Sequence, residues 1–170
     1  SEMKLGGILL VGPAEASTIS LVKSLKLPLV LVDNYVPGLA VDAVLGDNFE
    51  GARSAVDYLI NKGPTKIAFI AGSVISGPRP MNKIYTIERR AAGYRTALLD
   101  AGLSINYDLY EAGGLTLEGG YQACKRLLNH FTQTPFSAIF CANDATAIGS
   151  LKALREAGLR IPEEIYLIGF

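Results

Sequence analysis

The residues best suited to chemistry in this sequence are polar side chains that stand where apolar runs end. Asp33 follows one such run, and Asn143 and Asp144 follow another. Arg90 lies near the start of a segment with a helical pattern, within "TIERRAAGY". A forked guanidinium and an amide form paired hydrogen bonds in fixed geometry, which suits vicinal hydroxyls or a purine edge. These residue types therefore indicate recognition of a polar small molecule.

Most of these residues also have a structural explanation. Asn and Asp are preferred N-cap residues, so Asn143 or Asp144 can cap the helix that follows, and Asp47 has the same alternative before its own helix. Asp33 precedes "NYVPG", which favours a turn. Arg90 is harder to explain in this way, because a cation in the first turns of a helix is disfavoured by the helix dipole. We therefore expect a polar or anionic partner for Arg90.

The sequence lacks the signatures of common catalytic sites. It contains no GxGxxG after its first apolar run, no GxxxxGK[ST] and no GxSxG, and its single histidine, His130, lies late in an expected helix. The two cysteines, Cys124 and Cys141, lack metal-ligand spacing and are expected to be reduced core residues. We expect no catalytic residues, no metal and no cofactor, so the chain is predicted not to be an enzyme.

The composition is that of a globular, electrically neutral chain. Of 170 residues 49% are hydrophobic, and 16 basic residues balance 16 acidic ones without a run of like charge. Such a balance gives no electrostatic surface for nucleic acid or an anionic membrane. No apolar run reaches the roughly 20 residues that a membrane span needs. We therefore expect a cytoplasmic protein that does not contact membranes and does not itself bind DNA, although a mature exported protein would also lack a signal sequence.

Apolar runs alternate with amphipathic segments along the chain. The runs are too uniformly apolar for half-exposed strands, which predicts an α/β fold with parallel sheets covered by helices on both faces. Helix C-terminal glycines at 63, 102 and 158 support the helix boundaries. Residues 73–85 are predicted to form a long exposed loop. The strands are expected at 6–12, 28–33, 43–46, 66–72, 108–113, 137–142 and 165–170, and the helices at 16–25, 48–63, 86–102, 116–131 and 144–158.

The order of these segments resembles the effector-binding core of the LacI/GalR family of bacterial transcription regulators. The resemblance runs from about residue 5 to the end of the chain. Each motif is ordinary alone, but their order and spacing together are specific. The motifs are "LPLVLVDNY" (27–35), "VLGDNFEGARSAVDYLINKG" (44–63), "KIAFIAG" (66–72), "ERRAAGYRTALLDAGL" (88–103), "LTLEGGYQACKRLL" (115–128) and "AIFCANDATAIGSLKALREAGLRIPEEIYLIGF" (138–170).

The resemblance implies a set of ligand-binding residues in a cleft between two lobes. Arg90 matches the arginine that contacts the effector, and Asn143 matches the asparagine of the "AND" motif that faces it. Asp33 matches a position of the first lobe that lines the cleft. Thr86 and Leu115 fall where the family varies side chains to choose its ligand. Asp144 is left as the expected helix cap.

The resemblance also implies how the chain is organised and what it contacts. Residues 1–46 correspond to part of the N-terminal lobe and 47–170 to most of the C-terminal lobe, so the chain is expected to be a fragment without its helix-turn-helix DNA-binding domain. The implied function is a two-lobed, periplasmic-binding-protein-like sensor of a sugar or purine-like effector. Homodimerisation and DNA contact through the missing domain are expected. The alternative is a periplasmic sugar-binding protein of a transport system, although "GLRIPEEIYLIGF" favours the regulator.

Overall fold

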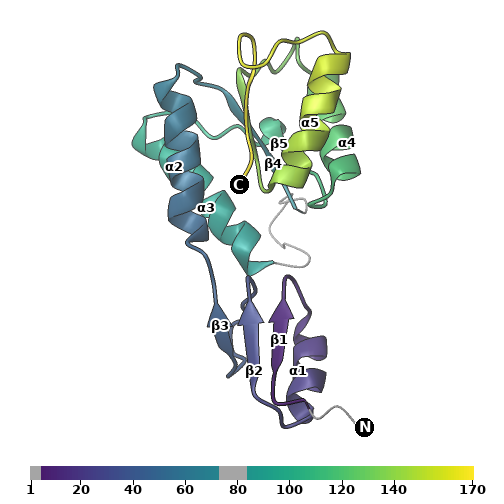
Figure 1. The fold of residues 1–170 in the computed structure, drawn as a ribbon. Helices are drawn as coiled ribbons and strands as arrows, with labels where there is room; N and C mark the ends of the chain where they lie inside the picture. Colours follow the sequence, from purple (N-terminus) through teal and green to yellow (C-terminus); the bar gives the residue numbers. More distant parts are fainter. Residues whose placement is uncertain (1–4, 73–83) are drawn as a thin grey trace.

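The computed structural model describes residues 5–72 and 84–170, which form two parallel sheets joined in sequence by one crossover (Figure 1). The smaller sheet has the order β1-β2-β3, and all its strands are parallel. Helix α1 connects its first two strands. Its elements are β1 (Ile8–Val11), α1 (Ala16–Ser24), β2 (Leu29–Val32) and β3 (Asp42–Val44).

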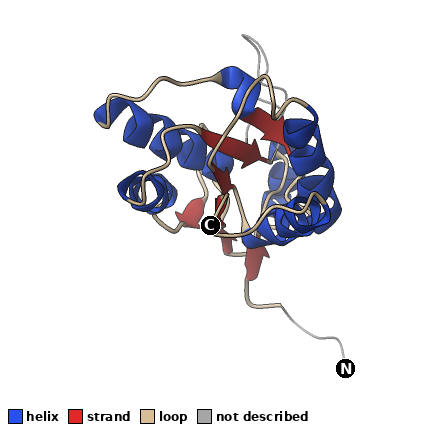
Figure 2. Cartoon of the chain, turned by 90° about the horizontal axis from the view of Figure 1, so that it is seen from above, coloured by secondary structure: helices blue, strands red, loops and turns tan. Residues whose placement is uncertain are grey.

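The larger sheet has the order β5-β4-β6-β7, and all three of its pairings are parallel. Every residue of β4 and β6 is buried, because helices cover both faces of the sheet (Figure 2). Its strands are β4 (Ile67–Ala71), β5 (Tyr110–Ala112), β6 (Ala138–Cys141) and β7 (Tyr166–Ile168), and its helices are α2 (Asn48–Asn61), α3 (Tyr85–Asp100), α4 (Leu117–Asn129) and α5 (Asp144–Glu156). A short 3₁₀ helix, Tyr107–Leu109, precedes β5.

The central strands alternate their side chains between two apolar cores. Phe69 and Phe140 belong to the core that includes buried residues of α2 and α3, and their rings stack with centroids 5.3 Å apart. Ile70 and Cys141, one position further along, belong to the core on the side of α4 and α5. This period of two is what a sheet covered on both faces requires.

Glycines allow the helices of each pair to approach closely. A Cβ at Gly93 of α3 would overlap the backbone carbonyl of Phe49 in α2, and a Cβ at Gly149 of α5 would overlap the carbonyl of Leu117 in α4. Gly120 is equally close to the backbone of α5. Glycines in α4 and α5 therefore allow these two helices to pack backbone against backbone.

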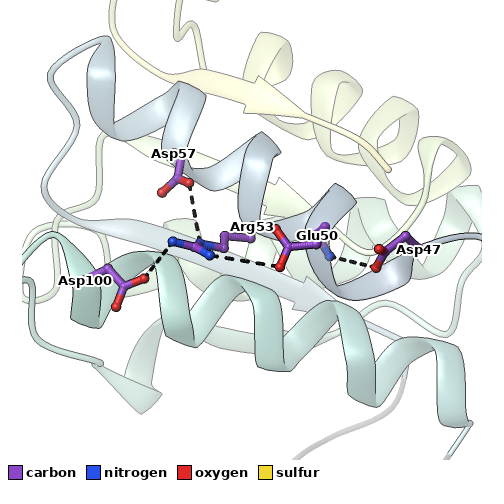
Figure 3. A network of polar contacts seen from close by, with 5 residues as sticks. All are labelled: Asp47, Glu50, Arg53, Asp57 and Asp100. Atoms are coloured by element: carbon purple, nitrogen blue, oxygen red, sulfur yellow. Dashed lines mark hydrogen bonds and ion pairs between the residues drawn. The ribbon is translucent and has the colours of Figure 1, made fainter.

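A surface network of charges also links α2 to α3 (Figure 3). Arg53 Nη2 lies 3.0 Å from Asp100 Oδ2, and Arg53 is 3.9 Å from carboxylates of both Glu50 and Asp57. Asp47 caps α2 by accepting a hydrogen bond from the Glu50 backbone N–H at 3.1 Å. Partly exposed ion pairs contribute little individually, so this network supplements the apolar contact between the helices.

The α/β fold with parallel sheets is confirmed, and the expected strands and helices are present with ends shifted by a few residues. The prediction of strand from residue 108 is wrong in part, because residues 107–109 form the 3₁₀ helix. The loop expected at 73–85 lies outside the described residues except for Ile84 and Tyr85, and Tyr85 begins α3. None of the helices in the described ranges is long and apolar enough to span a membrane.

Candidate ligand-binding site

Arg90 is a buried cation at the carboxyl end of the larger sheet. It lies in the second turn of α3 and is 8% exposed. Its Nε donates to Asn48 Oδ1 at 2.7 Å, and its Nη1 donates to the Ala142 carbonyl at 2.5 Å. The ring of Phe170 covers the guanidinium, with Cζ 3.9 Å from the ring centroid. Burial lowers the pKa of Arg90 from its ordinary value. A guanidinium nevertheless remains charged at neutral pH.

Asp33, at the end of β2, faces Arg90 from the smaller sheet. Its Oδ1 lies 4.0 Å from Arg90 Nη2, and its side chain is 50% exposed. The residue has a positive φ of 52°, a conformation that Asp tolerates better than most residues. The Asp33 carboxylate acts to raise the pKa of Arg90, against the larger effect of burial. The sequence predicts a polar or anionic partner for Arg90, and the structure provides one in Asp33 of the smaller sheet.

Asn143 uses both ends of its amide in the structure. Its Oδ1 accepts from the Thr146 backbone N–H at 2.9 Å, and its Nδ2 donates to the Leu115 carbonyl at 3.0 Å. Asn143 is thus the N-cap of α5, and the assignment of that role to Asp144 is wrong: Asp144 is the first helical residue. The cap position needs extended backbone, which Asn143 has and a helical residue lacks.

The structure brings the five predicted residues to one end of the larger sheet, and four of them form two linked pairs. Arg90 pairs with Asp33, and Asn143 bonds to Leu115, whose φ is +59°. The pairs meet because Arg90 bonds to the residue that precedes Asn143. Thr86 is 3% exposed and lies one helical turn before Arg90, on the same face of α3.

A cavity of 570 Å³ lies at the carboxyl ends of β1 and β2. Its lining includes Asn34, which is 4% exposed and donates to the Ala14 carbonyl at 3.3 Å. Tyr35 also lines it and meets Tyr85 edge to face, with ring centroids 4.8 Å apart. The lining residues are Pro13, Ala14, Glu15, Ala16, Ser17, Asn34, Tyr35, Val36 and Ile84.

Sequence reasoning missed the part of this cavity that follows β1. The ligand-facing side of an open α/β sheet lies beyond the carboxyl ends of its strands, so residues 13–17 could have been included by the same rule that selected Asp33. Within the described ranges, no group of three or more His, Cys, Asp or Glu side chains has the arrangement of a metal site. Cys124 and Cys141 are buried and free, as expected.

Comparison with known proteins identifies the family of the chain. A family model described as a periplasmic binding protein-like domain matches residues 56–170. The chain belongs to this family. The match covers the whole larger sheet with α3, α4 and α5.

The relatives narrow this assignment to the LacI type. The "Probable HTH-type transcriptional repressor ExuR" of Bacillus subtilis (strain 168) is 32% identical over 170 residues, which cover 99% of this chain and 48% of the relative. A LacI family transcriptional regulator from Mycobacterium smegmatis superposes with a TM-score of 0.84 at 28% identity, covering 98% of this chain and 58% of the other. A complex of the transcriptional regulator CelR with cellobiose gives a TM-score of 0.81 at 31% identity, covering 97% of this chain and 48% of the other.

The chain therefore corresponds to the periplasmic-binding-protein-like core of LacI-type regulators, which confirms the resemblance. It spans about half the length of the curated relative. The three relatives are named as a repressor or regulators, not as transport proteins or enzymes. This favours the regulator over the transport alternative and agrees with the expectation that the chain is not an enzyme.

Proposed function

We propose that this chain is the ligand-sensing core of a LacI-type transcriptional regulator, and that it binds a sugar or purine-like effector between its two sheets. One observation carries the proposal: Arg90, a buried charged donor of the larger sheet, faces Asp33 of the smaller sheet across 4.0 Å. A ligand at this point contacts both sheets. The CelR complex with cellobiose supports a sugar among the candidate ligands, because a relative of similar fold binds one.

The proposed ligand contacts follow from the groups that still have bonding capacity. Arg90 Nη2 carries two N–H groups, and the only partner found for it in the described residues is Asp33 at 4.0 Å. Asp33 would accept from ligand hydroxyl or N–H groups. Asn143 retains one N–H and one lone pair beyond its two bonds. Thr86 and Leu115 are proposed to shape the cleft beside Arg90 and Asn143.

The cavity beside this site would receive the remainder of the ligand. Its aromatic wall is Tyr35, and a ring edge or face of this kind packs against the apolar face of a sugar or the plane of a base. Asn34 and Ser17 offer polar groups in the same cavity. A cavity with one aromatic wall and several hydrogen-bonding groups suits a small, polar, ring-shaped ligand.

The proposed mechanism is a ligand-dependent change in how the two lobes are oriented. We assign residues 1–46 to part of the N-terminal lobe and 47–170 to most of the C-terminal lobe. A ligand that contacts both lobes stabilises the closed arrangement by its differential affinity for it. In the complete protein, a cytoplasmic homodimer would convey this change to a helix-turn-helix domain that is not in this chain, because paired half-sites require two-fold symmetry.

Isothermal titration calorimetry tests the proposal. The complete protein is titrated with a panel of monosaccharides, disaccharides, purines and nucleosides, and any binder is then titrated into Arg90→Ala. We expect Arg90→Ala to weaken binding by about 1.5 to 3 kcal/mol, the range for a hydrogen bond to a charged group. Arg89→Ala is the matched control, because Arg89 is the exposed neighbour of Arg90 on α3. Equal affinity in the wild type and Arg90→Ala would contradict the proposed site.

A further inference from the structure

Asn48 stands where the chain passes from one sheet to the other. β3 ends at Val44 and α2 begins at Asn48, so the crossover consists of Leu45, Gly46 and Asp47. Despite this position Asn48 is only 4% exposed. A buried amide needs hydrogen-bond partners, because leaving its polar atoms unpaired costs free energy.

The Asn48 side chain finds its partners on two different parts of the molecule. Its Nδ2 donates to the Gly46 carbonyl in the crossover at 3.0 Å, and its Oδ1 accepts from Arg90 Nε at 2.7 Å. Its backbone N–H also donates to the Gly46 carbonyl at 2.9 Å. The amide orientation is determined by these partners, since only the oxygen can accept from Arg90 and only the nitrogen can donate to Gly46.

These contacts restrict how Arg90 can meet a ligand. Asn48 occupies Nε and the Ala142 carbonyl occupies one N–H of Nη1, so the guanidinium is held from two sides. The edge left facing Asp33 is that of Nη2. A side chain held in this way loses less conformational freedom when it binds a ligand.

We propose that Asn48 is a positioning residue that orients Arg90 for the effector and couples Arg90 to the crossover between the lobes. A change in the crossover moves the Gly46 carbonyl, and with it the acceptor that orients the guanidinium. In the reverse direction, a ligand that fixes Arg90 restrains the crossover through the same amide. This inference rests on the proposed function, in which Arg90 contacts the effector.

The coupling between Asn48 and Arg90 is tested without a ligand. A negative result in this test would not contradict the proposed ligand site, and a negative result in the ligand titration would not contradict the coupling. NMR on the ¹⁵N-labelled chain measures solvent exchange of the Arg90 Nε–H, assigned with Arg90→Lys. We expect Asn48→Ala to accelerate this exchange by about tenfold or more, the factor that loss of a charge-assisted hydrogen bond gives. Asn48→Asp retains an acceptor for Nε and should keep the exchange slow. Asn61→Ala, an exposed asparagine at the end of α2, is the matched control.

The reciprocal variant keeps the test decisive if Asn48→Ala does not fold. In Arg90→Lys the forked donor is lost, and we expect the Asn48 backbone N–H to exchange several-fold faster because the crossover is no longer restrained. A protected Arg90 Nε–H in Asn48→Ala would overturn the proposal. Equal exchange in Asn48→Asp and Asn48→Ala, or an unchanged Asn48 amide in Arg90→Lys, would overturn it as well.

Discussion

The stability of the chain should depend on Asn143 even when no ligand is present. Asn143→Ala removes the cap bond to the Thr146 N–H and the bond from Nδ2 to the Leu115 carbonyl. Loss of an N-cap side chain typically costs about 1 kcal/mol, and loss of a neutral hydrogen bond costs about 1 kcal/mol. We therefore expect the free energy of unfolding to fall by about 2 kcal/mol, the sum of the two.

Two further variants separate these contributions. Asn143→Asp keeps an acceptor for the Thr146 N–H but loses the donor to Leu115, so about half of the loss should remain. Asp144→Ala removes an exposed carboxylate beside the cap, and its cost should be about 0.5 kcal/mol, from the helix dipole alone. Urea unfolding followed by circular dichroism measures all three. An Asn143→Ala protein as stable as Asp144→Ala would refute the capping argument.

Three further predictions concern packing and buried groups. Gly149→Ala should lower the free energy of unfolding by about 1 to 3 kcal/mol because its Cβ would overlap α4, whereas Gly46→Ala, with open space around it, should be nearly neutral in the same urea titration. Burial raises the pKa of both Cys124 and Cys141 to about 12, so a colorimetric thiol reagent should react slowly with the folded chain. After denaturation the reagent should detect two thiols per chain. Rapid reaction of both thiols in the native protein would contradict their burial. Burial raises the pKa of Tyr94 in the folded state, so the contribution of Tyr94 to the free energy of unfolding should be present below the ordinary tyrosine pKa of about 10 and be lost above it. In Tyr94→Phe the free energy of unfolding should therefore fall less at alkaline pH, and an equal fall in the variant and the wild type would contradict this prediction.

The larger sheet was predictable because its two central strands, β4 and β6, are buried on both faces. Residues 67–71 and 138–141 are apolar at every position, a pattern that parallel central strands produce and that few other structures share. Helix ends were marked by glycines such as Gly158, whose φ is +77°. The 3₁₀ helix at 107–109 escaped prediction because a single tight turn leaves no periodic pattern.

The positions of the candidate residues at the strand ends were predictable in part, but the contacts between them were not. Asp33 and Asn143 are selected because polar groups follow their strands, and Arg90 is selected because a cation in the first turns of a helix needs a partner. Which partner each one takes depends on the distance between elements far apart in the chain. The hydrogen bond between Asn48 and Arg90 joins residues 42 positions apart, so no local sequence pattern predicts it. Arg90 and Asn143 both bond to other parts of the fold, so truncation of either should lower stability as well as ligand binding.

The central claim is that one small ligand contacts both sheets at Arg90 and Asp33. The most direct measurement is a ¹H–¹⁵N NMR titration of the labelled protein with a binder from the sugar and purine panel. We predict simultaneous shifts of the Arg90 Nε–H signal and of the backbone amides of Asp33, Tyr35 and Asn143, which come from both sheets. Shifts confined to one sheet, or clustered away from the carboxyl ends of the strands, would contradict the account.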